Sequence, residues 1–152
     1  MMVRATSFAR AGFVMEVPWG TVQLEAQERH LRRKVIRLEN GADMLVDLEK
    51  PVQLQDGDCL VLEDGRLVRI AALPEALLEV RGTDSLHLAR LAWHIGNRHL
   101  EAQMELERIL IRPDHVIAQM LEGLGASLRP VRETFSPESG AYAHGPHGPH
   151  GH

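Results

Sequence analysis

The sequence predicts an α+β protein with two folded domains and an unstructured tail, and three observations support this. Up to about residue 72, short β-like runs alternate with turn signals and show no useful helical periodicity. Over residues 73–135, strand patterns alternate with two amphipathic helical patterns. Over residues 136–152, Pro, Gly, Ser and His replace the apolar periodicity, and such a segment buries too little to offset its ordering entropy.

The first domain, residues 1–72, is predicted to be β-rich and to contain two hairpins. The runs at 33–38 and 44–48 flank the Asn40-Gly41 pair, which supplies the positive φ of a tight hairpin turn. A second pair of apolar runs flanks residues 63–66, which have the composition of a turn.

Two helices are predicted in the second domain, residues 73–135. Thr83 or Asp84 can cap the first helix, and Gly96-Asn97 ends it. Asp114, after Pro113, can cap the second, and Gly123 or Gly125 ends it. Each helix has an apolar face at 3.6-residue spacing, made of Leu88, Leu91, Ala92 and Ile95 in the first and of Ile117, Met120, Leu121 and Leu124 in the second.

Four strand patterns surround these helices, at residues 76–80, 102–106, 108–112 and 127–134. Pro130 lacks an N–H group for a central ladder, so the last is predicted to be an edge strand. The order is β-α-β-β-α-β. This is the order of a ferredoxin-like domain, in which two helices cover one face of a four-stranded antiparallel sheet.

Composition and charge exclude several classes of function. The chain has 17 Lys and Arg against 21 Asp and Glu, a formal net charge of −4, so no broad attraction to nucleic acid or to an anionic membrane is expected. No stretch approaches the roughly 20 apolar residues of a membrane span, and residues 1–13 lack the apolar run of a signal peptide. We therefore expect a cytoplasmic protein. The single cysteine, Cys59, excludes an internal disulfide and is expected to be buried, and the basic run at 29–34 is expected to be a solvated face.

Histidine is the anomaly of the composition. The chain has nine histidines, and four of them, His144, His147, His150 and His152, fall in the last nine residues between Gly and Pro. Neutral imidazole is a ligand for nickel, copper, zinc and cobalt, and an open Gly-Pro backbone lets several imidazoles surround one ion. The Gly-Pro spacing differs from the uninterrupted run of a purification tag. Copper(II) would bind an all-imidazole site more tightly than nickel, so the tail predicts metal binding without selecting the metal.

The histidines of the second domain are less clustered. His87 and His94 are seven residues apart on one helix, about 10 Å, which is too far to share an ion, so both are expected to be structural. His115 opens a helix, where the dipole favours the neutral imidazole that metals require but also repels cations. It is therefore predicted to be a secondary ligand.

Three motifs occur in order along this half of the chain. Gly96-Asn97-Arg98-His99 follows the first helix, Asp114-His115-Val116 opens the second, and Phe135-Ser136-Pro137-Glu138-Ser139-Gly140-Ala141-Tyr142 precedes the histidine-bearing tail. Together they resemble the UreE family of urease accessory nickel metallochaperones. The family's two-domain plan, a peptide-chaperone-like domain followed by a ferredoxin-like metal-binding and dimerisation domain, also agrees with the pattern above.

The resemblance implies a homodimer in which the two copies of His99 face each other and hold one Ni(II). Two imidazoles are fewer ligands than nickel(II) prefers, so tail histidines are expected to complete the shell. Asn97 and Arg98 are expected to shape the loop and to support the site from outside, because Asn tolerates the left-handed conformation after a helix and Arg cannot ligate a cation. Some family members carry a His-x-His pair where this chain has Pro113-Asp114-His115.

The predicted function is therefore that of a nickel metallochaperone, not an enzyme, which donates Ni(II) to apo-urease. In the family a GTPase is among the partners, and Zn(II) or Cu(II) can compete for such ligands. A general store or buffer for nickel, zinc or copper is the main alternative. A metallohydrolase would need a rigid ligand set such as His-Glu-x-x-His, which the sequence lacks. A third alternative is a protein-docking module with an irrelevant tail.

Overall fold

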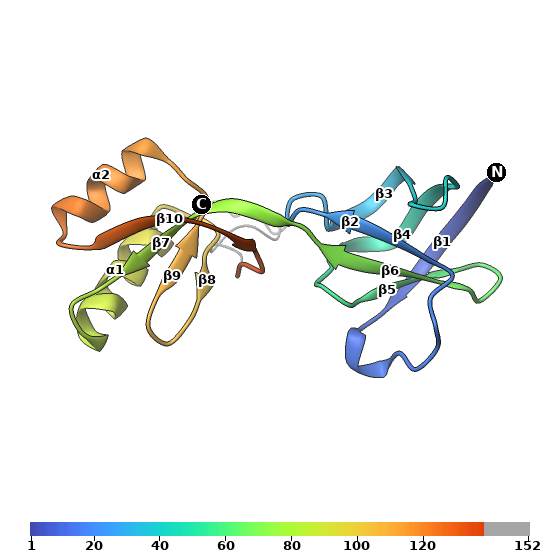
Figure 1. The fold of residues 1–152 in the computed structure, drawn as a ribbon, viewed down its shortest axis with the longest axis horizontal. Coiled ribbons are helices and arrows are strands. Elements are labelled where there is room, and N and C mark those ends of the chain that lie inside the picture. Colours follow the sequence, from blue (N-terminus) through green and yellow to red (C-terminus); the bar gives the residue numbers. More distant parts are fainter. Residues whose placement is uncertain (139–152) are drawn as a thin grey trace. The chain divides into compact units, whose positions relative to one another are not determined.

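The computed structural model describes residues 1–138 of the chain. The predicted tail ligands His144, His147, His150 and His152 lie outside the described residues. The described chain forms two compact units, Met1–Leu73 and a second unit that begins at Pro74 (Figure 1). Neither described helix is long and apolar enough to cross a membrane.

The first unit is a six-stranded sheet that encloses an apolar core (Figure 1). The strands lie in the order β2-β6-β5-β1-β4-β3, with β1–β4 and β2–β6 parallel and the other neighbours antiparallel. Alternation along the strands turns residues such as Met44, Val46 and Ile70 inward. The elements are β1 (Met2–Ala9), the 3-10 helix η1 (Ala11–Phe13), β2 (Gly20–Leu24), β3 (His30–Arg37), β4 (Asp43–Gln53), β5 (Cys59–Leu62) and β6 (Leu67–Ala72).

Both predicted hairpins are confirmed, because β3 pairs with β4 and β5 with β6 in antiparallel fashion. In the first turn Gly41 takes the left-handed conformation with φ of 88°. The Asn40 side chain accepts a hydrogen bond from the amide of Ala42 (3.0 Å). Cys59 is buried as expected, and its burial raises the pKa of the thiol.

The basic run at residues 29–34 is not the uniformly solvated face that the sequence suggested. Arg29 is fully buried. Its guanidinium donates hydrogen bonds to the carbonyls of Leu24 (3.4 Å) and Leu54 (3.1 Å), which supply partners that a buried charged group requires. Arg33 pairs with Asp47 at 2.9 Å. The pattern of charges alone could not reveal these partners, because they come from other segments.

The second unit has the predicted β-α-β-β-α-β order. Its elements are β7 (Pro74–Arg81), α1 (Ser85–Asn97), β8 (Gln103–Met104), β9 (Ile109–Ile111), α2 (His115–Gly123) and β10 (Ser127–Thr134). The strands form an antiparallel sheet in the order β10-β7-β9-β8, with Pro130 in an edge strand as predicted. β8 and β9 are shorter than predicted, because a turn closed by Glu105 and Arg108 (3.0 Å) occupies part of the apolar pattern.

Both helices begin at an aspartate cap. The side chain of Asp84 accepts a hydrogen bond from the amide of His87 (2.8 Å), and Asp114 accepts one from the amide of Ile117 (3.0 Å). Gly125, with φ of 89°, follows the end of α2. The helical faces pack on the sheet through one buried cluster, whose fully or nearly buried members are Val80, Leu88, Leu91, Ile95, Ala102, Ile109, Ile111, Ile117 and Leu121.

This topology gathers three chain segments at one end of the second unit. β7 runs from Pro74 to Arg81 and α1 runs back, so the residues after α1 lie at the Pro74 end. β9 runs antiparallel to β7, so α2 begins towards the same end. β10 also finishes there, because Thr134 pairs with Pro74. The segment around His99, the start of α2 and the chain leading to the tail therefore share this end.

Candidate metal centre

His99 lies in an unusual backbone conformation just beyond α1. Its φ is +59°, the only positive φ of a residue other than glycine within residues 1–138. Its amide donates a hydrogen bond to the carbonyl of Gly96 (2.9 Å), and the residue is exposed. The helix end thus fixes the backbone from which the imidazole projects.

Asn97 does not adopt the left-handed conformation that its residue type tolerates. Asn97 is the last residue of α1, and Arg98 is the C-cap with φ of −91°. The helix continues past Gly96, so the position after the cap, where the left-handed conformation belongs, falls on His99. Asn97 and Arg98 are both exposed on the approach to His99.

His115 is the first residue of α2 and is exposed. Its Nε2 lies 3.3 Å from the Nε2 of Gln119, one turn further along the helix. The topology brings His115 and His99 to the same end of the unit, as described above. Within residues 1–138, no group of three or more His, Cys, Asp or Glu side chains is arranged to hold a metal ion.

His87 makes hydrogen bonds to two other segments of the second unit, in agreement with the structural role expected for it. Nδ1 of His87 accepts a hydrogen bond from the amide of Thr83 (2.9 Å), so Nε2 carries the proton and donates to the carbonyl of Leu124 (2.8 Å). One imidazole therefore joins the start of α1 to the end of α2. The ring of His94 packs edge-on against Trp93, with centroids 5.1 Å apart.

Residues 135–138, which we call the strap, are attached to the folded unit. Phe135 is fully buried, and the amide of Ser136 donates to Oε1 of Gln103 (2.9 Å). Ala102 and Glu138 exchange two backbone hydrogen bonds of 3.3 and 2.8 Å. The sequence placed the start of the tail at Ser136, and these contacts attach residues 136–138 to the folded unit. Phe135, a large aromatic residue directly after a strand, was the available signal.

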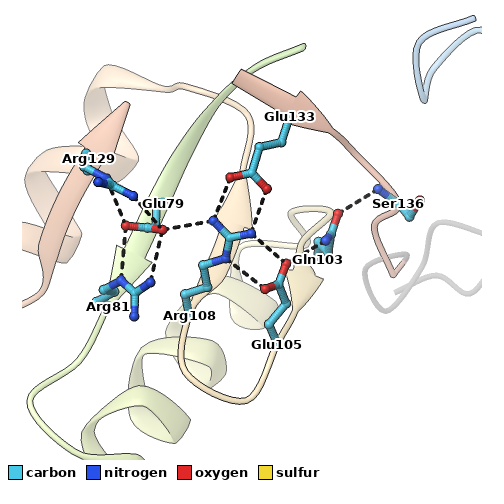
Figure 2. Close-up of polar contacts among 8 residues, drawn as sticks. All are labelled: Glu79, Arg81, Gln103, Glu105, Arg108, Arg129, Glu133 and Ser136. Atoms are coloured by element: carbon cyan, nitrogen blue, oxygen red, sulfur yellow. Dashed lines mark hydrogen bonds and ion pairs between the residues drawn. The ribbon is translucent and has the colours of Figure 1, made fainter. Parts of the chain in front are cut away.

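A network of charged side chains lies beside the strap (Figure 2). At its centre is Glu79 of β7, whose side chain is only 3% exposed and contacts three arginines. The nearest approaches are 2.9 Å from Arg108, 3.2 Å from Arg81 and 3.3 Å from Arg129. Burial alone would raise the pKa of Glu79, but the hydrogen bonds from Arg81 and Arg108 and the charge of Arg129 outweigh it and lower the pKa to about 2.

Arg108 connects this carboxylate to two others. Its guanidinium donates to Glu133 (2.7 Å) and to Glu105 (2.8 Å) as well as to Glu79, and these bonds raise its pKa. Glu105 in turn accepts a hydrogen bond from Nε2 of Gln103 (2.7 Å), the residue that holds Ser136 (Figure 2). This network was not predicted from the sequence. Its one visible signal was Glu79 itself, a charged residue inside an apolar run.

The fold and these histidines define a two-domain α+β protein that presents imidazole groups at one end of its second domain. Two family models match the chain: UreE urease accessory protein, N-terminal domain, over residues 14–73, and UreE urease accessory protein, C-terminal domain, over residues 75–152. The chain therefore belongs to the UreE family of urease accessory proteins.

Individual relatives agree with the family match. Urease accessory protein UreE of Brucella anthropi is 56% identical over 145 residues, which cover 95% of this chain and 85% of the relative. The protein of the same name from Rhizobium rhizogenes is 54% identical, with 96% of this chain and 88% of the relative covered. Urease accessory protein UreE 1 of Brucella suis biovar 1 is 55% identical, with 95% and 90% covered.

Proposed function

We propose that this protein is a nickel metallochaperone of urease maturation, which binds Ni(II) around His99 and donates it to apo-urease. The observation that carries the proposal is the exposed, left-handed His99 at the end of α1, inside the Gly96-Asn97-Arg98-His99 motif. Membership of a family of urease accessory proteins supports the urease step. In this proposal the protein carries the metal as cargo in the cytoplasm and catalyses no reaction.

The metal would be shared between two copies of the chain. Two His99 imidazoles from a homodimer supply fewer ligands than nickel(II) prefers, so His144, His147, His150 and His152 are the proposed additional ligands and His115 a secondary one. The tail ligands lie outside the described residues. Asn97 and Arg98 would shape the loop without ligating the ion, since a guanidinium cannot bind a cation.

The outer face of α1 supports the homodimer. Leu86 and Trp93 are seven residues apart, on one side of the helix, and are 60% and 64% exposed. Large apolar side chains on one helix face favour burial against a partner surface. We assign the second unit to the ferredoxin-like class on the basis of its strand order and its antiparallel pairing, and we propose that it carries both the dimer contact and the metal.

Transfer would proceed by ligand exchange. Tail imidazoles would load Ni(II) onto the His99 pair, and ligands of apo-urease would then replace them, with a GTPase among the accessory partners. A site that must release its metal needs replaceable ligands, unlike the closed four-ligand cage of a structural zinc site. Zn(II) and Cu(II) would compete for the same imidazoles, because neither is excluded by ligand type.

The test uses substitutions at His99 that suit its backbone. His99→Gly accepts a positive φ without strain, and His99→Asn tolerates it, so both should keep the fold while removing the imidazole. We expect the tightest nickel affinity measured by calorimetric titration to fall at least tenfold and urease activation in cells to fall with it. His30→Ala, at an exposed histidine in the first unit, is the matched control and should change neither.

The same experiment separates donation from storage. If His99→Gly left urease activation intact while shortening the chain to residues 1–138 lowered the total metal held, a general nickel, zinc or copper buffer would replace the proposal. If neither change altered nickel binding, the docking-module alternative would stand.

A further inference from the structure

The strap connects opposite edges of the second unit's sheet. β10 and β8 are the outermost strands of the order β10-β7-β9-β8. The strap leaves the end of β10 at Thr134, and Glu138 is paired with Ala102, the residue before β8. Three strand spacings separate those edges, about 14 Å. Four residues thus carry the chain from one edge to the other.

Each contact of the strap leads to the segment that follows His99. Ser136 is held by Gln103, and Glu138 is held by Ala102. The ring of buried Phe135 lies 5.0 Å from the guanidinium carbon of Arg112, which forms an ion pair with Glu101. The three residues contacted in this way, Glu101, Ala102 and Gln103, lie within four positions of His99.

The charged network connects the end of β10, where the strap begins, to the segment beside β8 that holds the strap. Arg108 ties Glu133, near the end of β10, to Glu105, and Glu105 is bonded to Gln103 (Figure 2). The start of the strap and its anchoring point are therefore joined by charge-assisted hydrogen bonds, which are stronger than neutral ones.

We propose that the strap positions the tail. Phe135, Gln103 and the Ala102–Glu138 pair fix the point at which the histidine-bearing segment leaves the fold, and they fix it beside the His99 loop instead of at the β10 edge. The proposal rests on the proposed function, because it matters only if tail histidines and His99 share a metal. In this proposal the residues that hold the strap position the tail and do not bind the metal themselves.

Chain length shows why the exit point matters. Glu138 and His144 are six positions apart in the sequence, which spans at most about 20 Å, whereas His99 and Ala102 are three positions apart, which spans at most about 10 Å. If the strap is released, Thr134 becomes the last residue attached to the fold. The segment that leads to His144 then spans ten positions and begins at the β10 edge of the sheet. The effective concentration of the tail imidazoles at His99 then falls, and apparent affinity falls in proportion.

The test is a calorimetric nickel titration of the full-length protein. Glu138→Pro removes the amide that donates to Ala102, and we expect it to weaken nickel binding about three- to tenfold. Ser139→Pro is the matched control, since it leaves the Ala102–Glu138 hydrogen bonds available, and should bind as the unaltered protein does. Gln103→Met, which loses the acceptor for Ser136, should act like Glu138→Pro.

A chain shortened to residues 1–138 distinguishes positioning from folding. Without the tail histidines, Glu138→Pro should no longer change nickel affinity, because positioning has nothing to act on. An equal loss in both backgrounds would overturn the proposal. The proposal would also be overturned if Glu138→Pro and Gln103→Met left nickel binding by the full-length protein unchanged, although shortening the chain and His99→Gly each weakened it. If shortening and His99→Gly also left binding unchanged, the proposed function itself would fail and the strap proposal with it.

Discussion

His99 joins the side chain proposed to bind the metal to a backbone conformation that most residues avoid. A left-handed residue other than glycine costs roughly 1–2 kcal/mol, although histidine is among the residues that adopt it more often. Glycine at the same position would end α1 with less strain. The fold thus retains an imidazole at a place where helix termination favours another residue, and strain of this kind concentrates at functional sites.

Glu79 is the residue on which the electrostatics of the second unit depend. Its folded-state pKa of about 2 lies below the ordinary value of 4.5. A lowered carboxyl pKa contributes stability that is complete above about pH 4.5 and is lost as the pH falls towards 2. The contribution is on the order of 3 kcal/mol. We predict that Glu79→Gln lowers the free energy of unfolding by about 2–4 kcal/mol at pH 7.

Urea unfolding at pH 7 and at pH 3 measures this effect. The stability difference between the unaltered protein and Glu79→Gln should shrink towards pH 3. Glu107→Gln, at an exposed glutamate in the β8–β9 turn, should have a small and pH-independent effect. A difference that stayed constant from pH 7 to pH 3 would contradict the assignment of the pH dependence to Glu79.

The site residues show which properties a sequence can reveal. His99 could be proposed as a ligand from the sequence because its motif is local. Its left-handed backbone could not be predicted, since α1 ends at Asn97 as predicted and the positive φ falls two residues later, on a residue type that does not by itself mark that conformation. Glu79 and Arg29 were missed because a buried charge is recognised by its partners, and those partners are distant: Arg108 and Arg129 for Glu79, and the Leu54 carbonyl for Arg29.

At the scale of elements, both helices and both hairpins were predictable because their signals are local. The aspartate caps, the apolar faces and the glycine turns all act within a few residues. The strap was not predictable, because its hydrogen bonds join residues more than 30 positions apart. Composition predicted disorder from Ser136 onward. For residues 136–138, the hydrogen bonds to Ala102 and Gln103 stabilise a fixed position that composition alone does not indicate.

His87 is the side chain that couples the two helices. We predict that His87→Ala lowers the free energy of unfolding by about 1–2 kcal/mol, because the amide of Thr83 and the carbonyl of Leu124 each lose a hydrogen-bond partner. Nickel affinity should stay within twofold of the unaltered protein, since His87 is a structural residue. Thermal unfolding and nickel titration of the same variant check both parts. Lost nickel binding with unchanged stability would make His87 a ligand instead.

At the scale of the whole molecule, the chain divides its apolar residues between two independent cores. One cluster belongs entirely to the first unit and the other entirely to the second unit, and no strand is shared between the sheets. Nickel ligands are proposed only in the second unit and the tail. We propose that the first unit, which resembles a peptide-chaperone-like domain, serves to dock protein partners.

This division makes a direct prediction for residues 74–152 produced alone. Because its core and its sheet are its own, this fragment should fold, form the dimer and bind nickel within about threefold of the full-length affinity, a factor worth less than 1 kcal/mol. In cells it should activate urease less well than the full chain, since the proposed docking unit is missing. Circular dichroism, mass measurement in solution and nickel titration test the first part. A folded, dimeric fragment that bound nickel ten times more weakly would show that the first unit contributes to the metal site.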